Sequence, residues 1–122
     1  MSKSLAQFES MKSLRLRTFN SFFEKICANI DAYYKALTCN ESSQAFLMPE
    51  NPEEPYLGGI QYSCIVPGKT FQPLTCLSGG EKSLAAFAFI FSCYSERFPS
   101  FFIFDEIDGP LDNYNIEKVF LF

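Results

Sequence analysis

The 122-residue chain has a net charge of −4, and nearly half of its residues are apolar, including fifteen Phe and six Tyr. This length allows one modest domain with a core, and the apolar content argues against a disordered chain. The acidic balance argues against a protein that binds nucleic acid on its own, because such proteins present a basic face. Residues 12–17 form a short basic strip, for which a solvated helix face is the favoured interpretation.

The five cysteines are widely spaced, with no C-x-x-C pair, and the chain has no histidine. A zinc site and a disulfide framework are therefore disfavoured, and we expect reduced, mostly buried thiols in a cytosolic or nuclear protein. Charged residues interrupt the N-terminus, which excludes a secretory signal. The longest apolar stretch, residues 84–91, is too short to span a bilayer, so we expect a soluble protein without a membrane partner.

Apolar periodicity predicts one long helix that begins near Ser4 and ends at residues 38–40, with a more polar first part that could project from the body. Proline and glycine then punctuate residues 40–73, where residues 60–66 read as a strand. Residues 80–94 predict a largely buried helix. The apolar run 101–104 predicts a strand covered on both faces, and Asp112 or Asn113 could cap a last helix.

Residues 78–81 match a capping box, with Ser78 as the N-cap and Glu81 at the third helical position. A capping box alone is common, but two glycines in a first helical turn are costly and suit a close approach to the backbone. Exposed N–H groups at a helix N-terminus bind anions such as phosphate. Helix capping and phosphate binding both remain open from these residues alone.

Two carboxylates, Asp105 and Glu106, follow the predicted strand directly. At the carboxyl edge of a sheet, an Asp can hold Mg²⁺ and a neighbouring Glu can activate an attacking water. The alternative is that the two carboxylates are merely solvated and cap the next segment. The pair alone does not decide between this reading and a magnesium and water-activating role.

Together these segments resemble the ATP-binding-cassette ATPases, in the form typical of the structural-maintenance-of-chromosomes (SMC) family. The family's signature motif is matched by six residues, and residues 101–106 resemble its Walker B strand. Residues 109–112 take the place of its D-loop. Residues 29–31, 34–37 and 50–57 resemble the cohesin branch of the family, SMC protein one. The six signature residues are Leu77, Ser78, Gly79, Gly80, Glu81 and Lys82.

The resemblance implies an α/β fold, namely the C-terminal lobe of an ABC-type ATPase head. Such a head has a P-loop NTPase-like mixed sheet with flanking helices, and this chain would hold only part of it. Residues 1–38 would be the end of a coiled coil, and residues 39–122 the lobe, ending before the switch histidine. The signature would contact the γ-phosphate of ATP held by an opposing head. Glu106 would be catalytic, Asp105 would help hold Mg²⁺, and Asp112 would couple the two heads.

The sequence departs from the family in lacking a G-x-x-x-x-G-K-[ST] loop, without which the phosphates have no primary site. Gly109 and Pro110 also replace the small-residue pair usual in the D-loop, a mild deviation because proline suits a loop. We therefore expect an ATP hydrolase only when a P-loop lobe and a partner head complete it, and an inactive chain alone.

The implied function is ATP-driven head engagement in chromosome cohesion, in the nucleus and on chromosomes. The implied partners are a second SMC head, a kleisin subunit and the missing N-terminal lobe, with DNA bound through the assembled complex. Two alternatives remain: a head lobe of another SMC-like complex, from condensin or DNA repair, and a non-catalytic lobe that docks a kleisin or a partner head.

Overall fold

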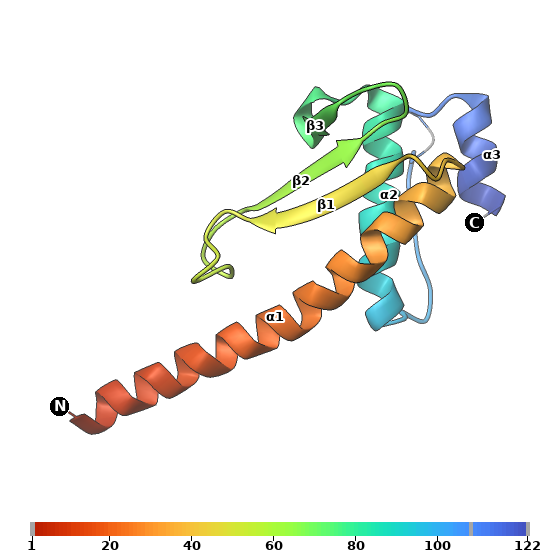
Figure 1. The fold of residues 1–122 in the computed structure, drawn as a ribbon. Helices are drawn as coiled ribbons and strands as arrows, with labels where there is room; N and C mark the ends of the chain where they lie inside the picture. The colour runs from red at the N-terminus through yellow and green to blue at the C-terminus, as the bar shows by residue number, and fades with distance from the viewer. Residues whose placement is uncertain (1, 108, 122) are drawn as a thin grey trace.

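The computed structural model describes residues 2–107 and 109–121 (Figure 1). A long helix, α1 (Ser2–Thr38), is followed by three strands, β1 (Gln44–Pro49), β2 (Ile60–Ile65) and β3 (Phe71–Pro73). A short 3₁₀ turn, η1 (Leu74–Cys76), leads into α2 (Gly79–Glu96), and α3 (Asn113–Leu121) follows. The predicted helices and the strand near residues 60–66 are therefore confirmed, within a residue or two at most ends.

The sheet is antiparallel throughout its described strands, in the order β1-β2-β3. Ala45 pairs with Cys64 and Ile65 pairs with Phe71. The C-terminal half of α1 packs against α2, and β1 lies along α1 (Figure 1). The core lies between these elements, where the apolar side chains of α1, α2 and one side of the sheet meet. Its fully buried members include Ile30, Tyr34, Leu37, Cys64, Ala85 and Ala88.

The N-terminal third of α1 projects away from this body (Figure 1). Residues 3–11 are exposed, including the large apolar side chains of Leu5, Phe8 and Met11. The loop between β1 and β2 reaches back to the helix where the projection begins. There Lys12 lies 2.9 Å from Glu54. Arg15 stacks over the ring of Tyr56, with 4.5 Å from the guanidinium carbon to the ring centroid. The basic strip is therefore not simply a solvated face, because two of its cations hold this loop.

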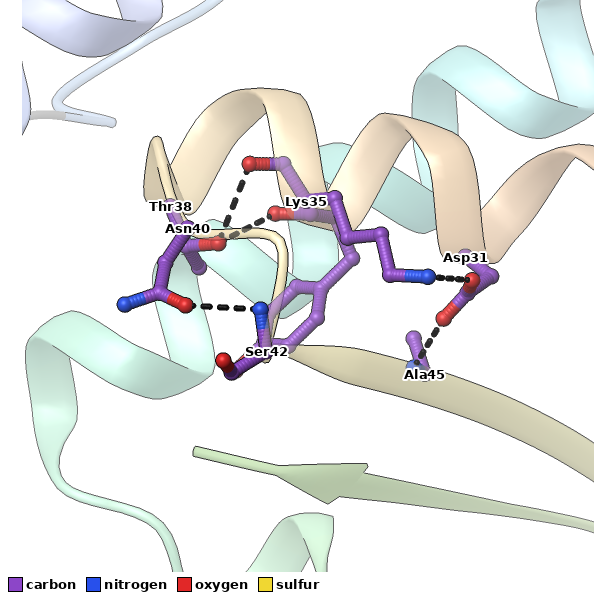
Figure 2. A network of polar contacts seen from close by, with 7 residues as sticks. Asp31, Lys35, Thr38, Asn40, Ser42 and Ala45 are labelled. Atoms are coloured by element: carbon purple, nitrogen blue, oxygen red, sulfur yellow. Dashed lines mark hydrogen bonds and ion pairs between the residues drawn. The ribbon is translucent and has the colours of Figure 1, made fainter. Parts of the chain in front are cut away.

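The end of α1 is fixed by local hydrogen bonds (Figure 2). Cys39 adopts a left-handed φ of 51°, its N–H donates to Ala36 and the N–H of Asn40 donates to Lys35. This is the Schellman arrangement, which satisfies carbonyl groups that the helix leaves unpaired. The side chain of Asn40 then accepts a 2.8 Å hydrogen bond from the N–H of Ser42. The chain thereby reverses toward β1.

Asp31 joins α1 to the first strand (Figure 2). One carboxylate oxygen accepts a 3.0 Å hydrogen bond from the N–H of Ala45, and the other lies 2.6 Å from the ammonium of Lys35. The Ala45 N–H would otherwise be a buried donor at the open edge of β1. Asp31 therefore sets how the sheet sits on the helix.

The strand predicted at residues 101–104 is absent from the structure. Phe102 and Phe104 do face α2, where they contact Tyr94 and Phe87 at centroid distances of 4.8 and 6.1 Å. Phe101 and Ile103 point away and are 74% and 84% exposed. The alternation of a strand is present, but no described strand lies beside this segment to pair with its backbone. The prediction is wrong because a covered strand needs neighbours on both sides.

Two expectations about burial are corrected. All five cysteines are free, but only Cys64 is buried, whereas Cys39 and Cys76 are exposed. In α2 the buried residues lie on one side of the helix, and Phe89 and Tyr94, at the margins of that side, are partly exposed. Among the described residues, no helix is both long and apolar enough to cross a membrane.

Candidate functional site

The N-terminus of α2 is held by the predicted capping box. The Ser78 N–H donates to one Glu81 carboxylate oxygen at 2.8 Å, and the Glu81 N–H donates to the Ser78 hydroxyl at 3.4 Å. Leu77, just before the cap, is buried in the core, and the Lys82 N–H bonds the Ser78 carbonyl at 2.9 Å. The first turn of α2 is therefore held in place by the buried side chain of Leu77 and by the capping box.

Neither glycine of this turn is required by the fold. A Cβ atom at Gly79 would lie 3.8 Å from the Pro110 Cβ, and one at Gly80 would lie 3.6 Å from Pro110 O and from the Asn115 amide nitrogen. These are ordinary contacts, and neither glycine has a positive φ. Alanine would fit at both positions and would favour the helix by at most about 1 kcal/mol each. Packing inside the molecule therefore does not explain why glycine, rather than a residue with a side chain, stands at positions 79 and 80.

The second Glu81 carboxylate oxygen pairs with Lys69, whose ammonium nitrogen lies 2.8 Å away. This hydrogen bond, together with the bond from Ser78, lowers the pKa of Glu81 below its ordinary value. Sequence reasoning did not single out Lys69. The turn residues Pro67 and Gly68 before it were a visible signal, but they do not reveal that the turn lies over the start of α2.

A cavity of about 580 Å³ adjoins the capping box. It is lined by the end of α1, the turn after β2, the start of α2 and the segment before and within α3. Ser78, Gly80 and Glu81 line it from one side, and Asp112 and Lys118 line it from the other. The structure therefore brings three of the six signature residues and the predicted D-loop aspartate to one cavity.

Asp112 has a local role in this arrangement. Its carboxylate accepts a 2.8 Å hydrogen bond from the N–H of Asn115, as an N-cap of α3. Near the other end of that helix, Lys118 donates a 3.0 Å hydrogen bond to the Thr38 carbonyl at the end of α1. Helix α3 is thus fixed at both ends, and the prediction that Asp112 could cap it is confirmed.

Asp105 and Glu106 are both exposed and lie outside the residues that line this cavity. Glu106 has a φ of 48°, which is strained for a residue with a Cβ. Its carbonyl oxygen accepts a 3.4 Å hydrogen bond from the N–H of Gly109. Strained backbone of this kind tends to gather at functional sites, and here it falls on the residue for which the sequence predicts a catalytic role.

Within residues 2–107 and 109–121, no three His, Cys, Asp or Glu residues form a metal-binding group. This does not exclude the predicted magnesium role of Asp105. Magnesium keeps several waters and takes one or two carboxylates with substrate phosphates, rather than a closed protein cage. An exposed carboxylate such as Asp105 fits that donor chemistry.

Comparison with known proteins agrees with the geometry, although no protein-family model matches the sequence. Structural maintenance of chromosomes protein 1B from Mus musculus is 54% identical over 113 residues, or 93% of this chain. Structural maintenance of chromosomes protein 1 from Caenorhabditis elegans is 52% identical over the same share. The chain spans only 9% of the length of each of these relatives.

Solved structures give the same result. The Smc head domain with an extended coiled coil from Pyrococcus furiosus, bound to the C-terminal domain of ScpA, aligns with a TM-score of 0.83 at 33% identity. That alignment covers 96% of this chain and 29% of the other. A structure described under ATP-driven dimerization and DNA-stimulated activation of SMC ATPases aligns with a TM-score of 0.74 at 33% identity, over 85% of this chain and 62% of the other. The chain therefore belongs to the structural-maintenance-of-chromosomes family, and its α/β fold is part of an SMC ATPase head.

Proposed function

We propose that this chain contributes the signature segment of an SMC head to ATP that is held by a partner head. The observation that carries the proposal is the first turn of α2, where two glycines keep the backbone bare although alanine would fit. The capping box holds this turn in place. Ser78, Gly79 and Gly80 would then meet the γ-phosphate through N–H groups, the Ser78 hydroxyl and the helix dipole.

The second part of the proposal concerns the nucleotide of this chain's own head. Asp105 would hold Mg²⁺, and Glu106 would orient and deprotonate the attacking water. When bound, the ion would offset charge on the phosphate oxygens. Asp112 would lie at the interface of the two heads, beside the signature of the same chain. The strained backbone of Glu106 supports a specialised role for this residue.

The assembly that follows contains a P-loop lobe, a partner SMC head and a kleisin subunit, with DNA bound by the complex as a whole. Its task would be ATP-driven head engagement in chromosome cohesion, on nuclear chromosomes. The projecting part of α1 would be the end of the coiled coil. The high identity to relatives named structural maintenance of chromosomes protein 1 favours cohesin over condensin or a repair complex.

The test uses this chain together with a P-loop lobe and a partner head. Glu106→Gln should reduce ATP turnover by roughly 100-fold or more, while ATP-dependent association of the heads persists. The purified chain alone should neither bind ATP tightly nor hydrolyse it. Turnover by the chain alone that Glu106→Gln leaves unchanged would show that the site is assigned wrongly.

Gly80→Ala separates the signature role from a purely structural one. The substitution should maintain or raise the thermal stability of the chain, because alanine fits and favours the helix. It should nevertheless weaken ATP-driven association, because the added methyl group stands where the phosphate must approach. Gly58→Ala, in the β1–β2 loop, is the matched control and should leave association unchanged. A non-catalytic lobe would instead bind its partners equally well with and without ATP, whatever residue stands at position 80.

A further inference from the structure

Lys69 is placed by a tight turn at the end of β2. The Lys69 N–H donates to the Val66 carbonyl at 2.9 Å, and Gly68 has a φ of 76°. Proline followed by a glycine with positive φ is the pattern of a type II turn. The turn reverses the chain beside the start of α2, so that a residue twelve positions before Glu81 meets it.

The Glu81 carboxylate is fully engaged at this point. One oxygen lies 2.8 Å from the Lys69 ammonium, and the other accepts the 2.8 Å hydrogen bond from the Ser78 N–H. The Glu81 side chain is 21% exposed and that of Lys69 is 46% exposed. Lys69 therefore fixes the Glu81 rotamer from the solvent side, while the helix terminus fixes it from the other.

This pairing removes an electrostatic conflict in the signature segment. The N-terminus of α2 attracts an anion, but a bare Glu81 carboxylate three residues from Ser78 would repel an incoming phosphate. An ammonium group on the far oxygen cancels that charge and leaves the capping bond in place. The attraction of the helix terminus for phosphate is then retained.

We propose that Lys69 is a positioning residue of the signature segment, which acts through Glu81 to make the α2 N-terminus competent for phosphate binding. The inference rests on the proposed function of residues 77–82. It adds a residue outside the motif, from the turn after β2, whose contribution is electrostatic neutralisation rather than direct contact with ATP.

The experiment is a double-mutant cycle in the complete head that contains this chain, paired with its partner head. The readout is the Kd of ATP-driven association. Lys69→Met should raise this Kd by roughly 3- to 10-fold. Lys69→Arg keeps the positive charge, so its Kd should stay within about twofold of the wild-type value. Glu81→Gln keeps an acceptor for the Ser78 N–H but removes the charge. In that background Lys69→Met should change the Kd by less than about twofold, because no charge remains to neutralise.

Thermal unfolding of the same proteins provides the readout for a merely structural role. Lys69→Met should hardly move the midpoint, because a partly exposed ion pair contributes little to stability. No change in Kd on Lys69→Met would overturn the inference. An equal loss in the Glu81→Gln background would also overturn it, because Lys69 would then act directly on the phosphate.

Gly80→Ala distinguishes the failure of this inference from the failure of the proposed function. If Gly80→Ala weakens association and Lys69→Met does not, the signature role stands and only the role of Lys69 is lost. If Gly80→Ala has no effect, the signature does not contact phosphate, and the role of Lys69 is lost with it.

Discussion

The hydroxyl of Tyr62 on β2 donates a 2.8 Å hydrogen bond to the main-chain carbonyl oxygen of Ala85 in α2. Tyr62 also lies against Phe89, with ring centroids 6.2 Å apart. Burial raises the pKa of the Tyr62 hydroxyl above its ordinary value, which favours the protonated form that donates this hydrogen bond. The middle of the sheet is thereby fixed to the helix that begins with the signature residues.

Tyr62→Phe should therefore destabilise the chain by about 1 kcal/mol, because it removes one partly buried hydrogen bond and keeps the ring. The free energy of unfolding, measured with urea, is the readout. Tyr56→Phe is a suitable control, since the Tyr56 hydroxyl makes only a long 3.4 Å bond to Glu54. A loss as large for Tyr56→Phe as for Tyr62→Phe would contradict the assignment.

Asp31→Ala should cost about 1–3 kcal/mol, because it leaves the buried Ala45 N–H without its acceptor. Lys35→Met is the matched control (Figure 2). It removes only the ion pair one helical turn away, which stabilises a helix by about 0.2–0.5 kcal/mol. Urea unfolding of both variants separates the two contacts of Asp31. Equal losses would mean that the ion pair, rather than the strand contact, stabilises this junction.

The capping box should give the chain an acid-dependent component of stability. The hydrogen bonds from Lys69 and from the capping residue Ser78 lower the pKa of Glu81 from its ordinary value of 4.5, so folding favours the ionised carboxylate. The stabilisation is then fully present above pH 4.5 and is lost as the pH falls through the folded-state pKa. Relative to Glu81→Gln, the wild-type chain should be more stable at pH 7. This advantage should shrink below pH 4.5, as followed by urea unfolding across the range. A constant difference from pH 7 to pH 3 would exclude Glu81 as its source.

The features predicted correctly from the sequence are those fixed by nearby residues. The capping box joins Ser78 and Glu81 within one turn, and the periodicity of α1 places Ile30, Tyr34 and Leu37 on its buried face. Local chemistry of this kind is readable without knowledge of the rest of the fold.

The features that were missed depend on residues far apart in the chain. Lys69 meets Glu81 only because the turn after β2 lies over α2, and Asp31 meets Ala45 only because β1 folds back along α1. The strand predicted at residues 101–104 failed for the same reason. A continuous apolar strand must be covered on both faces. The described part of the chain covers only the face of residues 101–104 that contacts α2.

The cysteines should differ widely in reactivity. Burial raises the pKa of the Cys64 thiol to about 11, and it also raises the pKa values of Cys27 and Cys93. Cys39 and Cys76 are exposed. With a thiol reagent at pH 8, peptide mass spectrometry should find Cys39 and Cys76 modified first and Cys64 modified only on unfolding. Early modification of Cys64 would show that the core between α1 and the sheet opens readily.

The exposed side of residues 101–104 should make the isolated chain self-associate. Phe101 and Ile103 point away from α2, on a segment that pairs with none of the described strands, which favours pairing with another copy. Phe101→Ser combined with Ile103→Asp should lower the concentration-dependent mass seen by light scattering, while the thermal midpoint stays unchanged. Phe102→Ser and Phe104→Ser form the matched control on the side that faces α2. They should lower the midpoint, because they remove the contacts with Tyr94 and Phe87. If the Phe101→Ser/Ile103→Asp variant still self-associates, the surface responsible lies elsewhere in the molecule, for example at the exposed apolar residues at the start of α1.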